Sequence, residues 1–252
     1  MLLRVLGSVS PHCHNEKNCP GFLVINNKTK ILLDCGNGIT SNLHYPEDLQ
    51  NLKIIISHLH RDHYGDLFSL AYDSYVYHNL GILKDKIQVY IPVQTTDQTK
   101  YDYDLLTNLG TEHYLEIFTY QLDNTLQFES TILSFSLNPH SIPSYSIKIE
   151  TNNQSLVYSG DTGYIGNTLE KFAAGTNLLI CESTFLKNQK RKQDYHLYAH
   201  EAALIAKKAN VDKLLLTHFW PGIEKKEYLK EAIPIFPKTE IAIENKTLNL
   251  IK

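Results

Sequence analysis

The chain has 252 residues, of which 42% are hydrophobic and 20% charged, and its formal net charge is -3. These values are ordinary for a soluble globular protein, and they exclude the strongly basic surface that holds long nucleic acid. No apolar run approaches the roughly 20 residues of a membrane-spanning helix, and the first residues lack a secretory signal. We therefore expect a cytoplasmic protein without a membrane segment.

Short apolar runs alternate with turn signals in the first part of the chain. They predict strands at residues 2–6, 21–25, 31–33 and 54–56. Gly65-Asp66 is a start signal that predicts a helix over residues 66–77. A strand at residues 88–91 should end at Pro92, and a helix over residues 95–108 should stop at Gly110.

The rest of the chain is first rich in strands and then in helices. Strands are predicted at residues 115–120, 125–128, 132–137, 145–150 and 155–158, with Asn152-Asn153 as a hairpin turn before the last. Helices are predicted at residues 169–174, 199–209 and 224–233, and short strands at 240–243 and 247–251. Two β-rich halves with helices outside fit one α/β domain over residues 1–252, a four-layer αβ/βα sandwich.

The most informative stretch is residues 58–63, with the sequence His-Leu-His-Arg-Asp-His. It places three imidazoles and one carboxylate directly after the apolar run 53–57, which predicts a buried strand. Imidazole and carboxylate are the ligands that suit zinc and similar divalent ions. We therefore predict a metal site at the end of this strand. The alternative is a histidine-rich loop without a function.

Other apolar runs also deliver a metal-type or acidic residue at their carboxyl ends, where α/β proteins build their sites. These residues are Asp34 after run 31–33, His140 after 135–139, Asp161 after 156–160, Glu182 after 178–181 and His218 after 214–217. Each one alone has an ordinary explanation as a turn former, a loop residue or a buried core residue. Together with residues 58–63 they predict a single site.

With the histidine loop, His140, Asp161 and His218 in this order, the chain resembles the metallo-β-lactamase-fold hydrolases over nearly its whole length. The resemblance implies that fold and two divalent ions that share a hydroxide, with zinc as the default and manganese or iron as other candidates. It assigns His58, His60 and His140 to one ion. It assigns Asp62, His63 and His218 to the second, and Asp161 as the bridge between them. Asp62 also counts among the catalytic residues, and Asp34 would orient a ligand imidazole from behind.

Residues 196–202, His-Leu-Tyr-Ala-His-Glu-Ala, resemble a motif of the RNase Z-like phosphodiesterase branch, His-Leu-Thr-Ala-x-x-Ala. In that branch the histidine faces the scissile phosphate and assists the leaving oxygen. The resemblance therefore implies that His196 is a general acid and that Glu182 orients it and raises its pKa. Tyr198 stands where the branch has threonine. The other reading of His196 is a surface residue at the start of a helix.

The same resemblance limits the substrate. Only the twenty residues 141–160 separate His140 from Asp161, so the long arm with which RNase Z grips tRNA has no room. We expect a small phosphodiester, such as a cyclic nucleotide or a short oligonucleotide, no long nucleic acid, and a homodimer. The basic run 187–192 either borders the pocket or is a solvated loop. Among the sixteen tyrosines, Tyr64 is the nearest stacking candidate to the metal loop.

Other functions stay open at this point. A hydrolase of carboxylic esters, lactones or thioesters would use the same metal site against a carbonyl, although it needs neither His196 nor Glu182. A metal-binding protein without catalysis would keep the ligands alone. A β-CASP nuclease would need an inserted domain, for which the chain has no room, and an iron oxidoreductase would need a domain that supplies electrons.

The chain has four cysteines, Cys13, Cys19, Cys35 and Cys181, and none forms a Cys-x-x-Cys pair. We expect reduced thiols that pack as small apolar groups. The alternative is that Cys13 and Cys19 bind a metal together with His12 and His14.

Overall fold

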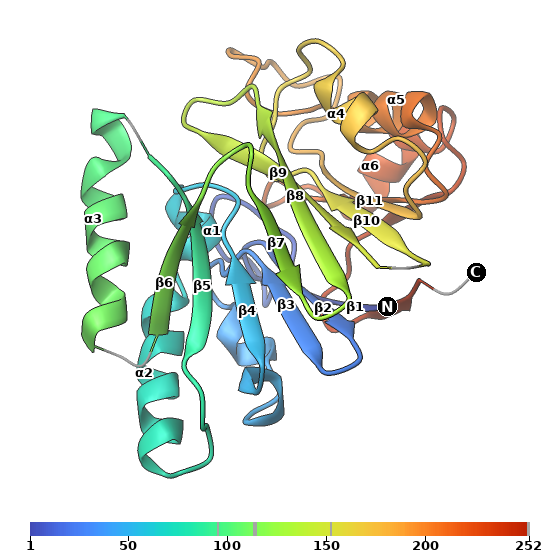
Figure 1. The fold of residues 1–252 in the computed structure, drawn as a ribbon. Helices are drawn as coiled ribbons and strands as arrows, with labels where there is room; N and C mark the ends of the chain where they lie inside the picture. Colours follow the sequence, from blue (N-terminus) through green and yellow to red (C-terminus); the bar gives the residue numbers. More distant parts are fainter. Residues whose placement is uncertain (95, 113–114, 152, 251–252) are drawn as a thin grey trace.

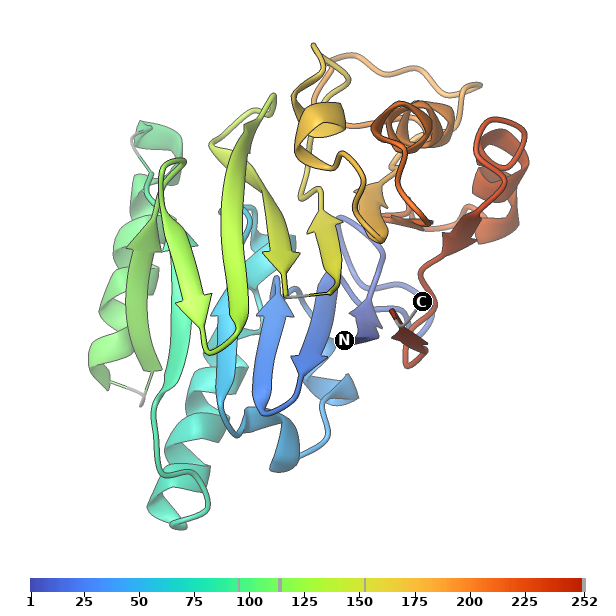
Figure 2. The same ribbon diagram turned by 45° about the vertical axis from the view of Figure 1, so that its right-hand side comes forward.

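Two seven-stranded sheets pack face to face, and helices cover the outer side of each (Figures 1 and 2). This arrangement is seen in a computed structural model that describes residues 1–94, 96–112, 115–151 and 153–250, with the side chains of 110–112 left out. It confirms the predicted αβ/βα sandwich. Thr95, Asn152 and Ile251, which belong to predicted elements, lie outside the described residues.

The first sheet has the strand order β14-β1-β2-β3-β4-β5-β6. Its strands are β1 (Leu2–Gly7), β2 (Gly21–Asn26), β3 (Thr29–Leu33), β4 (Leu52–Ile55), β5 (Ile87–Pro92), β6 (Leu115–Tyr120) and β14 (Thr247–Asn249). Neighbours from β3 to β6 pair in parallel, so their carboxyl ends lie at one edge of the sheet.

The second sheet has the order β13-β12-β11-β10-β9-β8-β7. Its strands are β7 (Thr125–Phe128), β8 (Thr131–Asn138), β9 (Ser144–Glu150), β10 (Ser155–Tyr158), β11 (Leu178–Glu182), β12 (Leu214–Thr217) and β13 (Thr239–Ile241). Strands β10 to β13 are parallel. Strand β8 runs in the same direction as β10, because both are antiparallel to β9.

The helices form the outer layers. They are α1 (Arg61–Tyr64), α2 (Leu67–Asn79), α3 (Asp97–Glu112), α4 (Thr168–Phe172), α5 (Ala199–Ala209) and α6 (Lys225–Ala232), with 3-10 turns η1 (Ile39–Asn42) and η2 (Glu47–Leu49). Helices α2 and α3 cover the first sheet, whereas α4, α5 and α6 lie on the second (Figure 1). Within the described ranges, no helix combines the length and the apolar character that crossing a membrane requires.

Because successive side chains of a strand point to opposite faces of the sheet, the first sheet contributes to two separate hydrophobic clusters. On β2, Phe22 and Val24 join the cluster between the two sheets, which extends beneath α5 and α6. Leu23 points the other way and joins a cluster with Leu70 of α2 and Leu106 of α3. Successive side chains of a strand face opposite sides of the sheet, so a strand apolar on both faces serves both clusters.

The predicted helices at 66–77, 169–174, 199–209 and 224–233 are confirmed to within two residues at each end. The predicted stop at Gly110 is wrong, because α3 continues to Glu112. Leu106 and Leu109 anchor this helix in the core, and such packing outweighs the cost of about 1 kcal/mol for a glycine inside a helix. The metal loop is also partly helical, since α1 begins at Arg61.

Candidate metal centre

The carboxyl ends of strands from both sheets meet at one place. The residues that follow or end these strands are Asp34 (β3), His58 (β4), His140 (β8), Asp161 (β10), Glu182 (β11) and His218 (β12). Two contacts join the sheets: His60 Nδ1 lies 3.2 Å from His140 Nε2, and His63 Nε2 lies 3.3 Å from His218 Nε2. The topology therefore brings the separate strand-end residues into a single cluster.

One half of the cluster contains His58, His60, His140 and Asp161, whose ligand atoms all lie within 4.8 Å of one another. His58 Nε2 is 3.1 Å from His60 Nδ1 and 3.5 Å from Asp161 Oδ2. This geometry offers three imidazole nitrogens and one carboxylate oxygen to a single point.

The other half contains Asp62, His63 and His218. Asp62 Oδ2 lies 3.7 Å from His63 Nε2 and 3.8 Å from His218 Nε2. The second oxygen of Asp161, Oδ1, lies 3.4 Å and 3.1 Å from the same two nitrogens. Asp161 thus stands between the halves, with one oxygen toward each.

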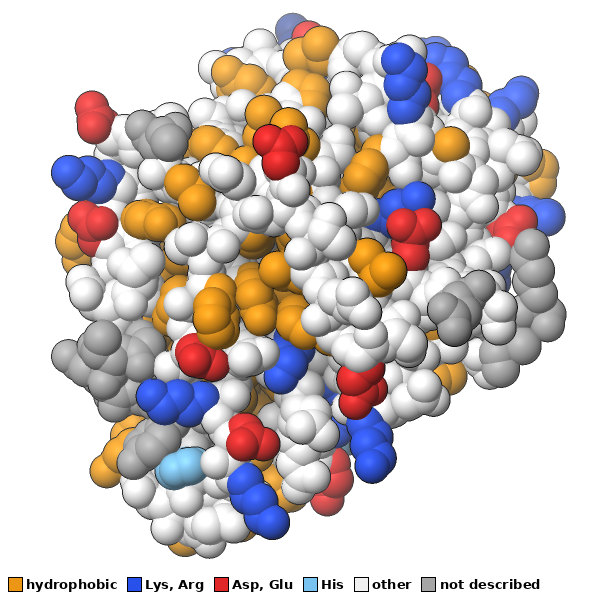
Figure 3. Space-filling model, viewed as in Figure 1, with side chains coloured by type: hydrophobic (Ala, Val, Ile, Leu, Met, Phe, Trp, Pro, Cys, Tyr) orange, Lys and Arg blue, Asp and Glu red, His pale blue; other side chains and the backbone are white. Residues whose placement is uncertain are grey.

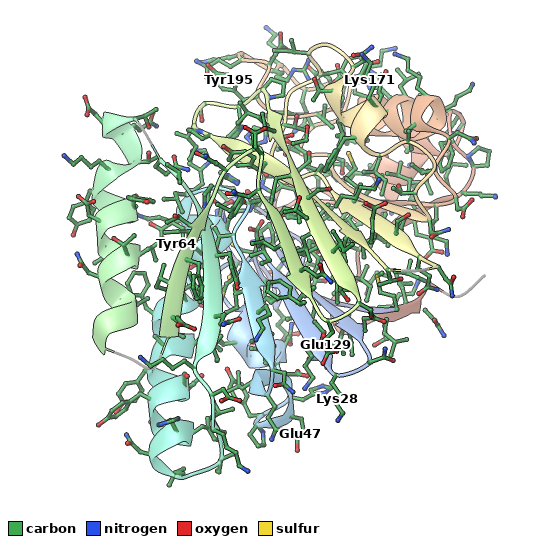
Figure 4. All side chains as sticks on the ribbon, in the orientation of Figure 1. Lys28, Glu47, Tyr64, Glu129, Lys171 and Tyr195 are labelled. Atoms are coloured by element: carbon green, nitrogen blue, oxygen red, sulfur yellow. The ribbon has the colours of Figure 1, made fainter. Side chains whose placement is uncertain are left out.

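The outer ring nitrogens are held by hydrogen bonds that aim the inner ones at the cluster. His63 Nδ1 donates to Asp34 Oδ2 at 2.7 Å, and His140 Nδ1 donates to the Tyr195 carbonyl at 3.0 Å. His58 Nδ1 contacts Ser57 Oγ at 3.0 Å, and His218 Nδ1 contacts Thr184 Oγ1 at 2.8 Å. With Nδ1 bonded outward, Nε2 of each of these rings faces the centre. Tyr195 lies in the loop above the sheets in Figure 4.

The hydroxyl groups of Ser57 and Thr184 each donate a hydrogen bond to a buried carboxylate. Ser57 Oγ donates to Asp34 Oδ2 at 2.9 Å, and Thr184 Oγ1 donates to Glu182 Oε2 at 2.8 Å. Asp34, which is fully buried, also accepts from the Ser57 backbone N–H at 2.6 Å and from Tyr158 Oη at 2.6 Å. Ser57, Thr184 and Tyr158 were not predicted as parts of the site. Their signal is weak, since a hydroxyl residue beside a ligand residue is common in any chain.

Burial sets the charge of most of these imidazoles. It lowers the pKa of His58 well below the usual range, lowers that of His60 to about 4, and also lowers the pKa of His140 and His218. These four rings are therefore neutral near pH 7, as metal ligands must be.

In two groups of the centre, Asp161 and His63, neighbouring charges outweigh burial and set the direction of the pKa shift. Burial opposes ionisation of Asp161, but His218 and His63 outweigh it and hold the pKa of Asp161 well below its usual range. Burial also opposes protonation of His63, but Asp161 and Asp62 outweigh it and raise the His63 pKa. The carboxylates thus attract positive charge to this point, and a cation among them would replace the proton of His63.

The structure itself tests whether these residues fit metal ions. Asp161 Oδ1 is buried and has no hydrogen-bond partner. Leaving a buried charged oxygen unsatisfied costs more than the roughly 1–3 kcal/mol of a neutral group. The ring nitrogens around it face one another with lone pairs. Cations satisfy both features at once, so the donor set fits divalent metal ions of the kind that bind imidazole and carboxylate.

His196 lies beside the cluster on a buried acidic support. Its Nδ1 donates to Glu182 Oε1 at 3.0 Å, and its ring stacks on that of His218 with centroids 5.4 Å apart. Glu182 also accepts from the backbone N–H groups of Thr162 at 2.9 Å and Leu197 at 3.1 Å. Burial opposes protonation of His196, but the Glu182 carboxylate outweighs it and raises the pKa to about 9.

The basic run at 187–192 does not act as one patch. Lys187, Lys190 and Lys192 are exposed. Arg191 instead turns inward: Nη1 donates to Glu201 Oε2 at 2.6 Å and to the His196 carbonyl at 2.7 Å, and Nη2 donates to Glu201 Oε1 at 3.2 Å. Its guanidinium lies 4.4 Å from the centre of the Tyr198 ring. Arg191 therefore fastens the segment that carries His196 to the start of α5.

Two sequence interpretations fail. Tyr64 is only 1% exposed and lies on the α3 side of the first sheet (Figure 4), so it offers no ring face for stacking. All four cysteines are free thiols, and Cys13 Sγ donates to the Asn37 carbonyl at 3.0 Å. Among the described residues, no group of candidate metal ligands includes Cys13 or Cys19.

Two packed sheets with outer helices and a histidine–aspartate centre at the strand ends define the metallo-β-lactamase fold. A family model described as the beta-lactamase superfamily domain matches residues 29–219. The chain therefore belongs to the β-lactamase superfamily, as a metallo-β-lactamase-fold hydrolase related to the RNase Z-like proteins. Membership of this fold family implies divalent metal ions, which the donor set fits.

Several known proteins are similar to the chain. Probable metallo-hydrolase YhfI of Bacillus subtilis is 28% identical over 219 residues, 86% of each chain. The crystal structure of YhfI superposes with a TM-score of 0.87 at 24% identity and covers 98% of this chain and 99% of that one. Ribonuclease Z of Saccharolobus solfataricus is 27% identical over 282 residues, 93% of this chain and 94% of that one.

Proposed function

We propose that the protein is a metal-dependent phosphodiesterase that cleaves a small phosphodiester, such as a cyclic nucleotide or a short oligonucleotide. The observation that carries the proposal is His196, which is half-buried beside the cluster and hydrogen-bonded to the buried Glu182. A phosphodiester expels an oxygen that needs a proton, and a protonated imidazole is a good donor near neutral pH. The similarity to ribonuclease Z supports phosphodiester chemistry.

In this proposal His58, His60 and His140 would hold one cation and Asp62, His63 and His218 a second, with Asp161 between the two groups. When bound, two divalent cations would supply a nucleophile from water at neutral pH and neutralise charge on the phosphate. The neutral imidazoles leave the positive charge of the site intact, whereas Asp161 and Asp62 offset the repulsion between the two positions.

The chain's own proton donor is His196. Its Nδ1–H stays on Glu182, so Nε2 is free to give a proton to the leaving oxygen. Glu182 stays ionised because His196 outweighs the effect of burial and lowers its pKa. The side chain of His196 is 25% exposed, which lets solvent return the proton after each turnover.

The expectation of a small substrate rests on the segment between His140 and Asp161 and on the net charge of -3. In the described residues of that segment, β9 and β10 take up most of the length and no arm is present. Acidic and basic side chains are interspersed over most of the face in Figure 3, and an acidic chain does not favour a long polyanion.

His196→Ala tests the proposal. We expect kcat on an alkyl phosphodiester such as a dinucleotide to fall by about 10²–10⁴-fold, the span of general acid help, with metal content unchanged. A nitrophenyl phosphodiester should lose less, because its leaving group needs less help. His200→Ala is the matched control: His200 lies on α5, 3.6 Å from Glu231, away from the cluster. Loss of metal from His196→Ala, or turnover of only lactones and thioesters by the wild type, would contradict the proposal.

A further inference from the structure

The chain has one tryptophan, Trp220, and it lies two residues after His218. Its side chain is 43% exposed although it is among the largest apolar groups in the protein. Phe185, which follows β11, lies next to it with ring centroids 6.4 Å apart and planes inclined by 21°. The two rings therefore face nearly the same direction, and we call Phe185 and Trp220 the aromatic shelf.

The aromatic shelf borders the proposed site of the reaction. The Phe185 ring centroid is 6.2 Å from that of His196. Trp220 is tied to the centre through the backbone of His218. A substrate with its phosphate at the cluster would carry its neighbouring group over these rings.

Hydrogen bonds hold the backbone that carries each of the two rings. The backbone N–H of Trp220 donates to Tyr228 Oη at 3.1 Å. The preceding residue, Phe219, exchanges backbone hydrogen bonds with Ser8 and Ser10. The Phe185 N–H donates to the Leu197 carbonyl at 3.1 Å. A preformed aromatic surface binds a flat group at a small entropic cost.

The aromatic shelf is not needed to fill the core. Phe219, which is 1% exposed, packs on the buried Tyr228 with centroids 4.8 Å apart and closes the core beneath it. Trp220 is left half outside this packing. Aromatic faces of this kind stack on nucleobases, and such stacking tolerates different bases because every base has a π face.

We propose that the aromatic shelf binds the nucleobase of the substrate, so that the ligand class is a nucleoside phosphate ester. The inference rests on the phosphodiesterase proposal and adds the part of the substrate that gives affinity. It assigns the hydrogen-bonding and proton-transfer roles to the cluster and His196, and the stacking role to Phe185 and Trp220.

Binding of three phosphates to the metal-loaded protein tests this inference. The probes are adenosine 5′-monophosphate, ribose 5-phosphate, which lacks the base, and hexyl phosphate, which is apolar without a ring. We expect the adenosine compound to bind most tightly and to quench the single tryptophan. In Trp220→Ala, the affinity ratio of the adenosine compound to ribose 5-phosphate should fall about 5- to 150-fold, the range of base–aromatic stacking.

Further variants guard against a folding defect. Phe185→Leu should lower the same ratio, and Trp220→Phe should keep most of it. Tyr72→Ala, a change at an aromatic residue that is 61% exposed on α2, is the matched control and should leave the ratio unchanged. Equal binding of the adenosine compound and ribose 5-phosphate by the wild type would overturn the inference. So would an equal loss for hexyl phosphate in Trp220→Ala.

Hydrolysis of a base-free phosphodiester separates the two proposals. Turnover of that compound together with no base preference would refute the aromatic shelf and leave the phosphodiesterase standing. A base preference that depends on Trp220, in a protein without phosphodiester turnover, would refute the phosphodiesterase and leave the aromatic shelf standing.

Discussion

At the scale of single residues, the orientation of each imidazole depends on the partner of its outer nitrogen. Asp34 holds His63 directly and holds His58 through Ser57. Thr184 links His218 to Glu182, the same carboxylate that supports His196. The buried carboxylates of Asp34 and Glu182 therefore hold the candidate ligand imidazoles and His196 in place. A change at either carboxylate affects more than one ring.

The buried imidazoles predict how the metal-free protein responds to acid. Burial lowers the pKa of His60 to about 4, whereas an unfolded histidine titrates near 6.5. Between these values the unfolded chain binds a proton that the folded chain refuses, so stability falls as the pH drops from about 6.5 to about 4. The slope is up to about 1.4 kcal/mol per pH unit for each such group.

Urea unfolding of the metal-free protein at pH 7, 6 and 5 measures this effect. His58, His140 and His218 shift in the same direction as His60, so the wild type should lose stability across the series. His60→Asn should give a shallower decline. An unchanged pH dependence in this variant would show that His60 is not held neutral by burial.

Single residues also show what sequence can predict. The candidate ligand residues stand out because they follow apolar runs, and the structure brings all of them together. Ser57 and Thr184 do not stand out, because a hydroxyl gains its role only when folding places a ring nitrogen beside it. Trp220 gave no periodic signal either, since the role that we propose for it depends on its remaining half exposed.

At the scale of elements, the segment between β11 and α5 carries the residues to which we assign proton donation and base stacking. The segment contains Phe185, Arg191 and His196. Arg191 donates hydrogen bonds both to the His196 carbonyl and to Glu201 in the first turn of α5, and so joins the end of the segment to the helix. Glu201 also accepts from the Tyr198 backbone N–H at 2.9 Å, which caps the helix. Besides Glu182, Arg191 therefore helps to fix the position of His196.

Arg191→Met should lower kcat about 10–100-fold, as loss of a supporting residue does, without changing KM in proportion or removing metal. Arg191→Lys should recover little, because lysine cannot form the paired bonds to Glu201. Lys190→Met is the matched control, since Lys190 is an exposed residue of the same segment. Steady-state kinetics with metal analysis measures both. A normal kcat in Arg191→Met would remove Arg191 from the positioning role.

Element prediction succeeded where local pattern and tertiary packing agree. Helix α5 has the predicted bounds because its small buried face matches a helical period. It failed at Gly110, where burial of neighbouring leucines carries α3 onward, and at α1, whose single turn is too short to show a period. Where packing against distant residues decides the end of a helix or strand, the local sequence does not predict that end.

At the scale of the whole molecule, the centre joins two sheets. His58, His60, Asp62 and His63 come from the first sheet, whereas His140, Asp161 and His218 come from the second. Strand patterns predicted that each residue lies at a strand end. Together with the histidine loop they also predicted a single site, but the assignment of each residue to one of two cations came from the resemblance to a known family. Relative placement of sheets depends on contacts between residues far apart in the chain, which local patterns do not record.

The central claim is that this junction holds two divalent cations bridged by Asp161. Metal analysis of the zinc-loaded protein, freed of excess ion, tests it most directly, with Asp161→Asn beside the wild type. The matched control is Asp73→Asn, a carboxylate of α2 that accepts a hydrogen bond from Tyr45 Oη at 2.9 Å. We predict two ions per chain in the wild type and the control, and fewer in Asp161→Asn. One ion or none in the wild type, or an undiminished content in Asp161→Asn, would contradict the account.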